Sequence, residues 1–158
     1  MRVEFVIPGE PVGWQRAGEN SRSGRHFMQE KTKNYECNAG LEYKKEAAKK
    51  GASGFLRPPL AVFISAYHRP PKSWTKKKRE EAFGRLWIGK PDGDNIAKAV
   101  LDGLSGIAFR DDAEVAVTVV RKLYTRNPED DPRTEVTVMD EGGYIAINLR
   151  IREAVKKS

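Results

Sequence analysis

Residues 89–115 read GKPDGDNIAKAVLDGLSGIAFRDDAEV, and they combine the clearest helix signal of the chain with five aspartates. Within them, residues 94–104 predict an amphipathic helix, with Asp94 or Asn95 as its N-cap and Ser105-Gly106 as its stop. Its apolar side chains recur at helical spacing and form one stripe: Ile96, Ala97, Val100, Leu101 and Leu104. The β-branched run that follows, residues 114–124, predicts a strand.

The acidic side chains of this stretch suggest a metal site. Five aspartates fall within 21 positions: Asp92, Asp94, Asp102, Asp111 and Asp112. Their mutual repulsion is costly unless a cation compensates it. A compact fold could bring Asp111-Asp112 back beside Asp92 and Asp94, and three convergent carboxylates suit Mg²⁺. Such an ion can activate water and neutralise the charge that develops on a phosphodiester, while Lys98, one helical turn beyond Asp94, can stabilise the transition state.

Each of these side chains also has a purely structural interpretation. Asp94 can cap the helix and interact favourably with its dipole. Lys98 can form an ordinary surface pair with Asp94 or Asp102, four positions away on either side. Asp111-Asp112 can simply form a turn. The residues alone leave both interpretations open.

Outward from this stretch, the chain alternates strand and helix signals. We expect further strands over residues 2–7, 60–67, 134–139 and 144–151, the last two joined by a turn at Gly142-Gly143. We expect further helices over residues 30–50 and 73–82, the second capped by Ser73. The first of these helices should bury four side chains at four-residue spacing: Tyr35, Ala39, Tyr43 and Ala47. The predicted fold is α+β (mixed α/β): a single compact domain, residues 1–158, with about five strands in a mixed sheet and about three helices, and with residues 152–158 as a frayed tail.

The composition excludes several classes of protein. A chain of 158 residues has room for one compact domain. Its single cysteine, Cys37, excludes a disulfide framework and cysteine-based zinc fingers, and its two histidines argue against histidine-rich metal sites. No run approaches the roughly 18 apolar residues of a membrane span, and the N-terminus is unlike a signal peptide. We therefore expect an intracellular, cytoplasmic protein without a membrane partner.

The basic side chains point to a polyanionic partner. The net charge is +7, and residues 69–90 carry eight basic against two acidic side chains, directly before the acidic stretch. A basic block attracts phosphates, although such a run can also be a solvated helix face. The expected DNA-contacting residues lie in this block and in the glycine-rich loop 12–28: Arg16, Arg22, Arg25, Lys72, Lys76, Lys77, Lys78 and Arg79. Trp14 of this loop is a candidate for stacking on a base, whereas Trp87, between two aliphatic residues, is expected in the core.

The motif in this stretch resembles that of a known family. Asp92-Gly93-Asp94-Asn95, then Lys98, then Leu101-Asp102-Gly103-Leu104 and a closing Phe109-x-Asp111-Asp112, resemble the core motif of RusA-type Holliday junction resolvases. The resemblance implies a homodimeric, Mg²⁺-dependent endodeoxyribonuclease, with Mn²⁺ as a possible substitute, that nicks four-way DNA junctions symmetrically in recombination and repair. Such enzymes are often encoded by phages or prophages.

The resemblance also assigns roles by motif position. Asp92, Asp94 and Asp112 would be the catalytic, metal-binding carboxylates, with Asp111 a less favoured third ligand, and Lys98 would be the catalytic lysine. The alternative hypothesis is a non-catalytic DNA- or RNA-binding module whose acidic cluster is structural. A restriction-type nuclease is disfavoured because Val120 stands where its D/E-x-K pattern needs an acid before Lys122.

Overall fold

The computed structural model describes residues 1–15 and 24–156, and the side chains of residues 24–29, 152 and 156 are not described. Along the chain the elements are β1 (Arg2–Pro8), α1 (Gly24–Lys49), β2 (Leu60–His68), α2 (Lys76–Ala82), α3 (Gly93–Leu104), the 3₁₀ turn η1 (Asp112–Glu114), β3 (Val115–Tyr124), β4 (Arg133–Asp140) and α4 (Glu141–Lys156). The fold is therefore α+β, as predicted. Among the described residues there are four strands rather than about five, and four α-helices rather than three.

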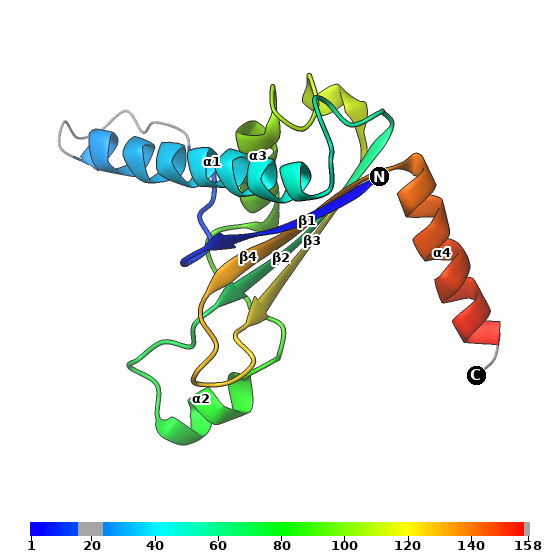
Figure 1. The fold of residues 1–158 in the computed structure, drawn as a ribbon. Coiled ribbons are helices and arrows are strands. Elements are labelled where there is room, and N and C mark those ends of the chain that lie inside the picture. The colour runs from blue at the N-terminus through cyan, green and yellow to red at the C-terminus, as the bar shows by residue number, and fades with distance from the viewer. Residues whose placement is uncertain (16–23, 157–158) are drawn as a thin grey trace.

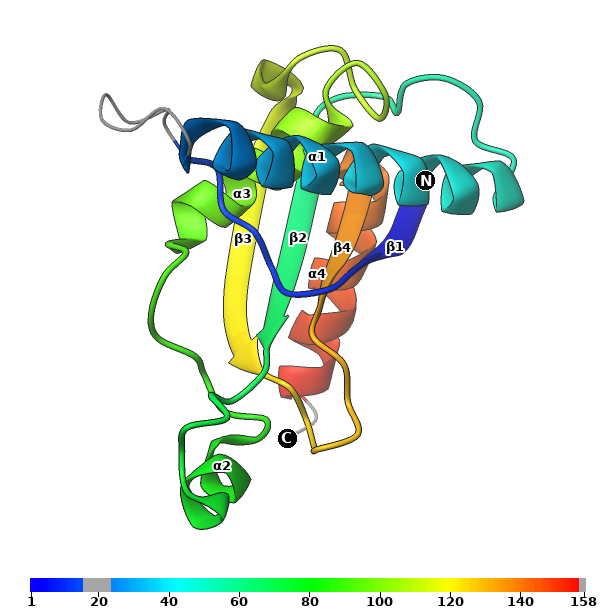
Figure 2. The same cartoon turned by 90° about the vertical axis from the view of Figure 1, so that its left-hand side faces the viewer.

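The four strands form one mixed sheet in the order β1-β4-β2-β3. β4 pairs antiparallel with both β1 and β2, and β2 pairs parallel with the edge strand β3. Helices α1 and α3 cover one face of this sheet, and α4 lies on the other (Figures 1 and 2). The chain between β2 and α3 forms an arm that carries α2 away from the sheet (Figure 1).

The core lies between the sheet and the helices α1 and α3. The four α1 side chains expected at four-residue spacing, Tyr35, Ala39, Tyr43 and Ala47, are all at most 5% exposed. The helix 94–104 is confirmed as α3, and its buried side chains include Ile96, Val100 and Leu104. Three alternate side chains of β1 and the even-numbered ones of β2 face these helices. The periodicity of the sequence therefore identified the principal core positions.

Glycines let α1 and α3 approach each other closely. A Cβ atom at Gly103 of α3 would stand 2.6 Å from the backbone oxygen of Glu36 on α1. At Gly40 of α1 it would stand 2.9 Å from the oxygen of Gly103. Only glycine fits at such a contact between two helix backbones. The crossing therefore places Glu36 beside the part of α3 that carries the motif.

The expected strand over residues 144–151 is wrong, because this segment belongs to α4. β4 already has β1 and β2 on its two sides, so a hairpin after Gly142-Gly143 would find no free edge beside it. The Asp140 side chain instead accepts a hydrogen bond from the Gly143 backbone N–H at 2.9 Å, as a helix cap does. Tyr144 then stacks on Phe63 of β2, with ring centroids 6.3 Å apart.

Three further boundaries differ from the expected ones. Thr75, not Ser73, caps α2 by accepting a hydrogen bond from the Lys78 backbone N–H. Helix α1 begins at Gly24, inside the segment expected to be a loop. The tail is helical to Lys156, so residues 152–156 extend α4 instead of fraying.

Candidate active site

The turn into α3 presents two carboxylates. Asp92 stands at the N-cap position, but its side chain makes no capping hydrogen bond, so neither Asp94 nor Asn95 is the N-cap as expected. The Asp92 carboxylate instead accepts a hydrogen bond from Lys90 Nζ at 2.5 Å, and this bond holds the pKa of Asp92 below its usual value. Asp92 and then Asp94 raise the pKa of Lys90. The two carboxylates thus already attract one cation, the Lys90 ammonium.

A second lysine links this turn to the sheet through hydrogen bonds. Lys122 of β3 donates from Nζ to the backbone oxygens of Gly89 at 2.9 Å and Pro91 at 3.3 Å. Its ammonium also lies 4.9 Å from the centre of the Trp87 ring. The turn that carries Asp92 and Asp94 is therefore held at a fixed place beside the edge strand. Sequence analysis gave Lys122 no such role, because nothing in the local pattern ties a strand lysine to a turn so much earlier in the chain.

The neighbouring aspartates Asp111 and Asp112 have different surroundings. The Asp111 side chain accepts a hydrogen bond from the Ala113 backbone N–H at 2.8 Å and caps η1. The Asp112 side chain makes no hydrogen bond or ion pair with any described residue. Partial burial, followed by the nearby Asp102 and Asp111, raises its pKa, and Lys98 opposes this shift. Asp112 is therefore an uncompensated carboxylate close to Lys98.

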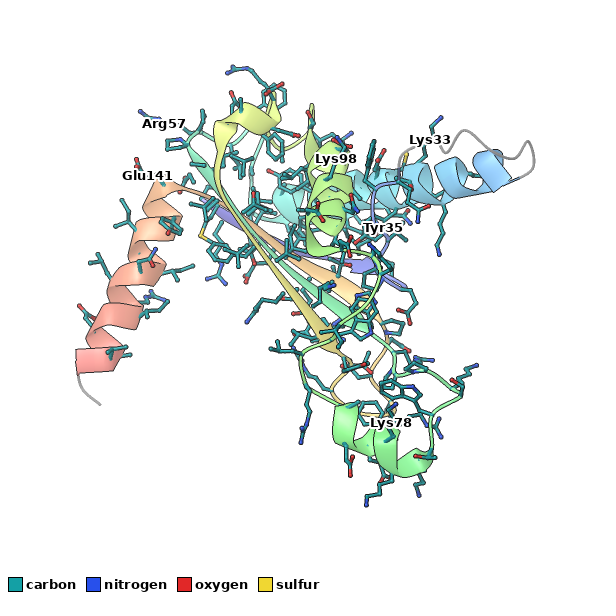
Figure 3. All side chains as sticks on the ribbon, turned by 180° about the vertical axis from the view of Figure 1, so that it is seen from behind. Lys33, Tyr35, Arg57, Lys78, Lys98 and Glu141 are labelled. Carbon is teal, nitrogen blue, oxygen red and sulfur yellow. The ribbon has the colours of Figure 1, made fainter. Side chains whose placement is uncertain are left out.

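Lys98 lies on α3 (Figure 3), one helical turn after Asp94 in the sequence. It contributes to the electrostatic environment of Asp112 and also to that of Glu36 on α1. Burial, and then the charge of Asp102, raise the pKa of Glu36. Sequence analysis overlooked Glu36, because only the close crossing of α1 and α3 brings it to the motif.

The expected carboxylates do not form a closed metal cage. Within residues 1–15 and 24–156, no three histidine, cysteine or acidic side chains are grouped so that they could hold a metal ion by themselves. Asp92 and Asp94 belong to one turn, whereas Asp112 lies near Lys98 and Asp102. The site is open, with Asp94, Lys98 and Asp112 all exposed.

A cavity of about 390 Å³ adjoins the turn. It lies between the N-terminal segment, α1 and the start of α3, and its lining includes Trp14, Lys31, Lys90, Asp92 and Asn95. Two of these side chains are cationic, so the cavity offers positive charge and an aromatic surface beside the Asp92 carboxylate. Such a combination suits a phosphate-bearing ligand.

The expected DNA-contacting residues fall into two groups. The arm places Lys76, Lys77 and Lys78 on the exposed surface of α2, with Arg79 half-buried and Lys72 exposed before the helix. Lys78 is labelled in Figure 3, at the opposite end of the molecule from α1. Arg16 and Arg22 lie outside the described residues, and Arg25 belongs to the first turns of α1 without a described side chain.

The aromatic side chains differ in part from expectation. Trp14 is half-buried and packs against the core instead of extending freely from a loop. Trp87 is half-buried and stacks on the buried His68 with ring centroids 3.7 Å apart. Trp87 is not part of the hydrophobic core, so the expected core position is wrong, and its neighbours Leu86 and Ile88 are 75% and 87% exposed.

The described part of the chain contains no helix that is long and apolar enough to span a membrane. Comparison with known proteins agrees with the motif. The family described as Endodeoxyribonuclease RusA matches residues 8–139. An uncharacterized protein of Bacillus subtilis (strain 168), YqaN, is 30% identical over 144 residues, covering 87% of this chain and 96% of the relative. The matched region contains the whole motif with its carboxylates and lysine, and the chain belongs to the RusA endodeoxyribonuclease family.

Proposed function

We propose that this protein is a Mg²⁺-dependent endonuclease that resolves four-way DNA junctions by paired, symmetric nicks. In this proposal Asp92, Asp94 and Asp112 bind the metal and Lys98 stabilises the charge of the phosphate under attack. The α2 arm and the arginines of residues 16–25 would contact the phosphates of the DNA arms. Membership of the RusA family supports the nuclease activity; the junction, the metal and the paired nicks belong to the proposal.

The observation that carries the proposal is that three of the five aspartates, Asp94, Asp102 and Asp112, make no hydrogen bond or ion pair with any described residue, and that two of the three are also exposed. The side chains of Asp94 and Asp112 are exposed and make no hydrogen bond to any described residue. A structural acidic cluster would use its carboxylates as caps or in ion pairs, as Asp111 is used at the start of η1. The alternative of a non-catalytic binding module with a structural acidic cluster therefore does not explain why Asp94 and Asp112 are unpaired.

The donor set fits Mg²⁺. This ion prefers oxygen ligands, retains several waters, and is usually held by one or two carboxylates together with substrate phosphates. An open site of exposed carboxylates meets that need without a closed cage. A bound Mg²⁺ or Mn²⁺ would supply charge neutralisation at the phosphodiester. The chain itself orients the carboxylates through Lys90 and Lys122 and supplies the Lys98 ammonium.

A direct test is the cleavage of an end-labelled synthetic four-way junction beside a linear duplex of the same sequence. We expect paired nicks on the junction alone, in Mg²⁺ or Mn²⁺ and not with chelator. The Asp94→Asn variant should bind the junction at least as well as the wild type, because one negative charge near the phosphates is gone, yet should not cut it.

Glu141→Gln is a matched control. It removes the same charge at the start of α4, on the other side of the sheet from Lys98 (Figure 3), and should cut normally. Junction binding without any cutting by the wild type in either metal would overturn the proposal and favour the binding module. Loss of junction binding in a folded Asp94→Asn protein would argue against the assigned site.

A further inference from the structure

The Lys98 ammonium lies over the ring of Trp14. Its Nζ atom is 4.5 Å from the ring centroid, well inside the range of a cation–π interaction. The two residues are far apart in the sequence and come from different segments, the stretch after β1 and the middle of α3. The contact therefore exists only because the N-terminal segment docks on α3.

This docking is specific at the level of the backbone. The Trp14 backbone N–H donates to the Asn95 backbone oxygen at 2.8 Å. Gly13 lies so close to the turn that a Cβ atom there would stand 2.5 Å from the Pro91 Cβ and 3.2 Å from the Asn95 Cβ. Trp14 also packs against the hydrophobic core. The indole is thus fixed relative to the turn that carries Asp92 and Asp94.

Two aspartates on α3 are placed to form an ion pair with Lys98, but neither does. Asp94 and Asp102 lie four positions before and after it, where ion pairs on a helix commonly form. Lys98 nevertheless forms no salt bridge with any described residue, although Lys45 and Lys49 on α1 each pair with a nearby glutamate at 2.6 Å. The ammonium lies over the indole instead.

We propose that Trp14 is a positioning residue that holds the Lys98 ammonium on its ring and away from Asp94 and Asp102. Asp94 then stays free for a metal ion, and the ammonium stays free for the phosphate. This inference deepens the proposed function and rests on it. It predicts that an aromatic ring, rather than bulk, is the property needed at position 14.

The test compares Trp14→Phe, which keeps a ring, with Trp14→Leu, which keeps apolar bulk only. In single-turnover and steady-state cleavage of the junction, Trp14→Leu should lower kcat about fivefold or more while KM changes less than about twofold. Trp14→Phe should restore most of kcat. Leu41→Ala, which removes apolar bulk from an exposed position of α1 outside this segment, should retain the wild-type kcat.

A second readout does not depend on activity. In lysine-labelled protein, the ring current of Trp14 should shift the ε-methylene protons of Lys98 upfield. The shift should persist in Trp14→Phe and vanish in Trp14→Leu. Equal kcat in the two variants, or an unshifted Lys98 in the wild type, would overturn the inference. A wild-type protein with the shifted resonance but no cleavage in Mg²⁺ or Mn²⁺ would instead overturn the proposed function, and the catalytic purpose of Trp14 with it.

Discussion

Asp111 and Asp112 are adjacent in the sequence, yet the structure gives them different tasks. Asp111 caps η1, and the Asp112 side chain is left unpaired beside Lys98. We expect Asp112→Asn to lower junction cleavage by about 100-fold or more, since a metal ligand contributes several kcal/mol to the transition state. Asp111→Asn keeps a side chain that can cap, and it should cut within about tenfold of wild type. Cleavage rates of the two purified variants would decide between them, and the reverse order would make Asp111 the ligand.

His68 predicts how stability depends on pH. It is 4% exposed, stacked on Trp87, and its Nε2 has no hydrogen-bond partner among the described residues. Burial, aided by the charge of Lys122, lowers its pKa from 6.5 to about 4, even though Glu10 lies 3.6 Å from Nδ1. Between about pH 4 and pH 6.5, His68 is protonated in the unfolded chain and neutral in the folded chain. Stability is therefore complete above about pH 6.5 and falls as the pH drops towards 4.

The expected loss across this window is about 2 to 3 kcal/mol of unfolding free energy. Urea unfolding at pH 7.5 and pH 4.5 measures it, with His68→Gln as the comparison. The variant should be less stable at pH 7.5 because its stacking is poorer, but its stability should depend less on pH. An equal pH dependence in the two proteins, or a His68 pKa near 6.5 by NMR titration, would contradict the assignment.

The sequence suggests candidate site residues through local spacing, but it does not predict their long-range contacts. The spacing of Asp92, Asp94 and Lys98 is local, so one turn and one helix suffice to place them. Trp14, Glu36 and Lys122 reach the same region from three other elements. Such long-range contacts leave no periodic signal in a single sequence. They depend instead on glycines such as Gly13 and Gly103, whose close packing is visible only in three dimensions.

At the scale of elements, α2 lends itself to a test because it consists almost entirely of charged side chains on an arm. Neutralising Lys76, Lys77 and Lys78 to glutamine should weaken junction binding. It should also reduce the slope of log K against log salt by roughly one unit for each DNA phosphate that the protein no longer neutralises. Fluorescence anisotropy across a salt series measures both effects.

A matched control for this prediction neutralises Lys44, Lys45 and Lys49 on α1, where Lys45 and Lys49 are already paired with glutamates. This control changes the net charge by the same amount, and it should reduce the slope of log K against log salt less than the α2 substitutions do. A slope unchanged by the α2 substitutions, or reduced equally by the control, would place the DNA surface elsewhere.

Helix α4 shows where pattern and topology conflict. The run YIAINLRI is rich in β-branched and aliphatic residues, and on its own it is typical of a strand. The place it would take in the sheet is filled, since β4 has partners on both sides. The same residues then form a helix whose Tyr144 stacks on Phe63 of the sheet. A segment with strand propensity therefore forms a strand only where a sheet edge is free to pair with it. The local sequence does not show whether such an edge is free.

At the scale of the whole molecule, the two faces of the sheet are covered to different extents. The face under α1 and α3 is closed by the core, and the site lies at its margin. The other face is covered only by α4, and Val119, which is paired with Phe63, remains 37% exposed there. Four large apolar side chains of α4 are also exposed: Ile145, Leu149, Ile151 and Val155, between 49% and 69%. Apolar surface of this extent on one side of a molecule is typical of an interface.

A second copy of this chain is the occupant that best suits the proposed function, because a four-way junction needs two coordinated cuts and a two-fold dimer supplies two equivalent sites. In such a dimer, α4 of each copy would cover the part of the partner's sheet face that the partner's own α4 leaves exposed. We expect the wild type to sediment as a dimer and the double variant Ile145→Glu with Leu149→Glu, two exposed residues on one side of α4, as a monomer. Leu41→Glu is the matched control: Leu41 is 52% exposed on α1, across the sheet, and its replacement should leave the dimer intact.

The consequence for cleavage separates the dimer from the active site. A folded monomer would retain Asp92, Asp94, Lys98 and Asp112, so it should still nick, but the two nicks should lose their coupling. On a junction in a supercoiled circle, the wild type should then give linear product within one binding event, and the variant should accumulate nicked circles. Coupled cutting by a protein that sediments as a monomer would show that pairing does not use α4. A variant that still sediments as a dimer would assign the apolar face of this helix to another partner.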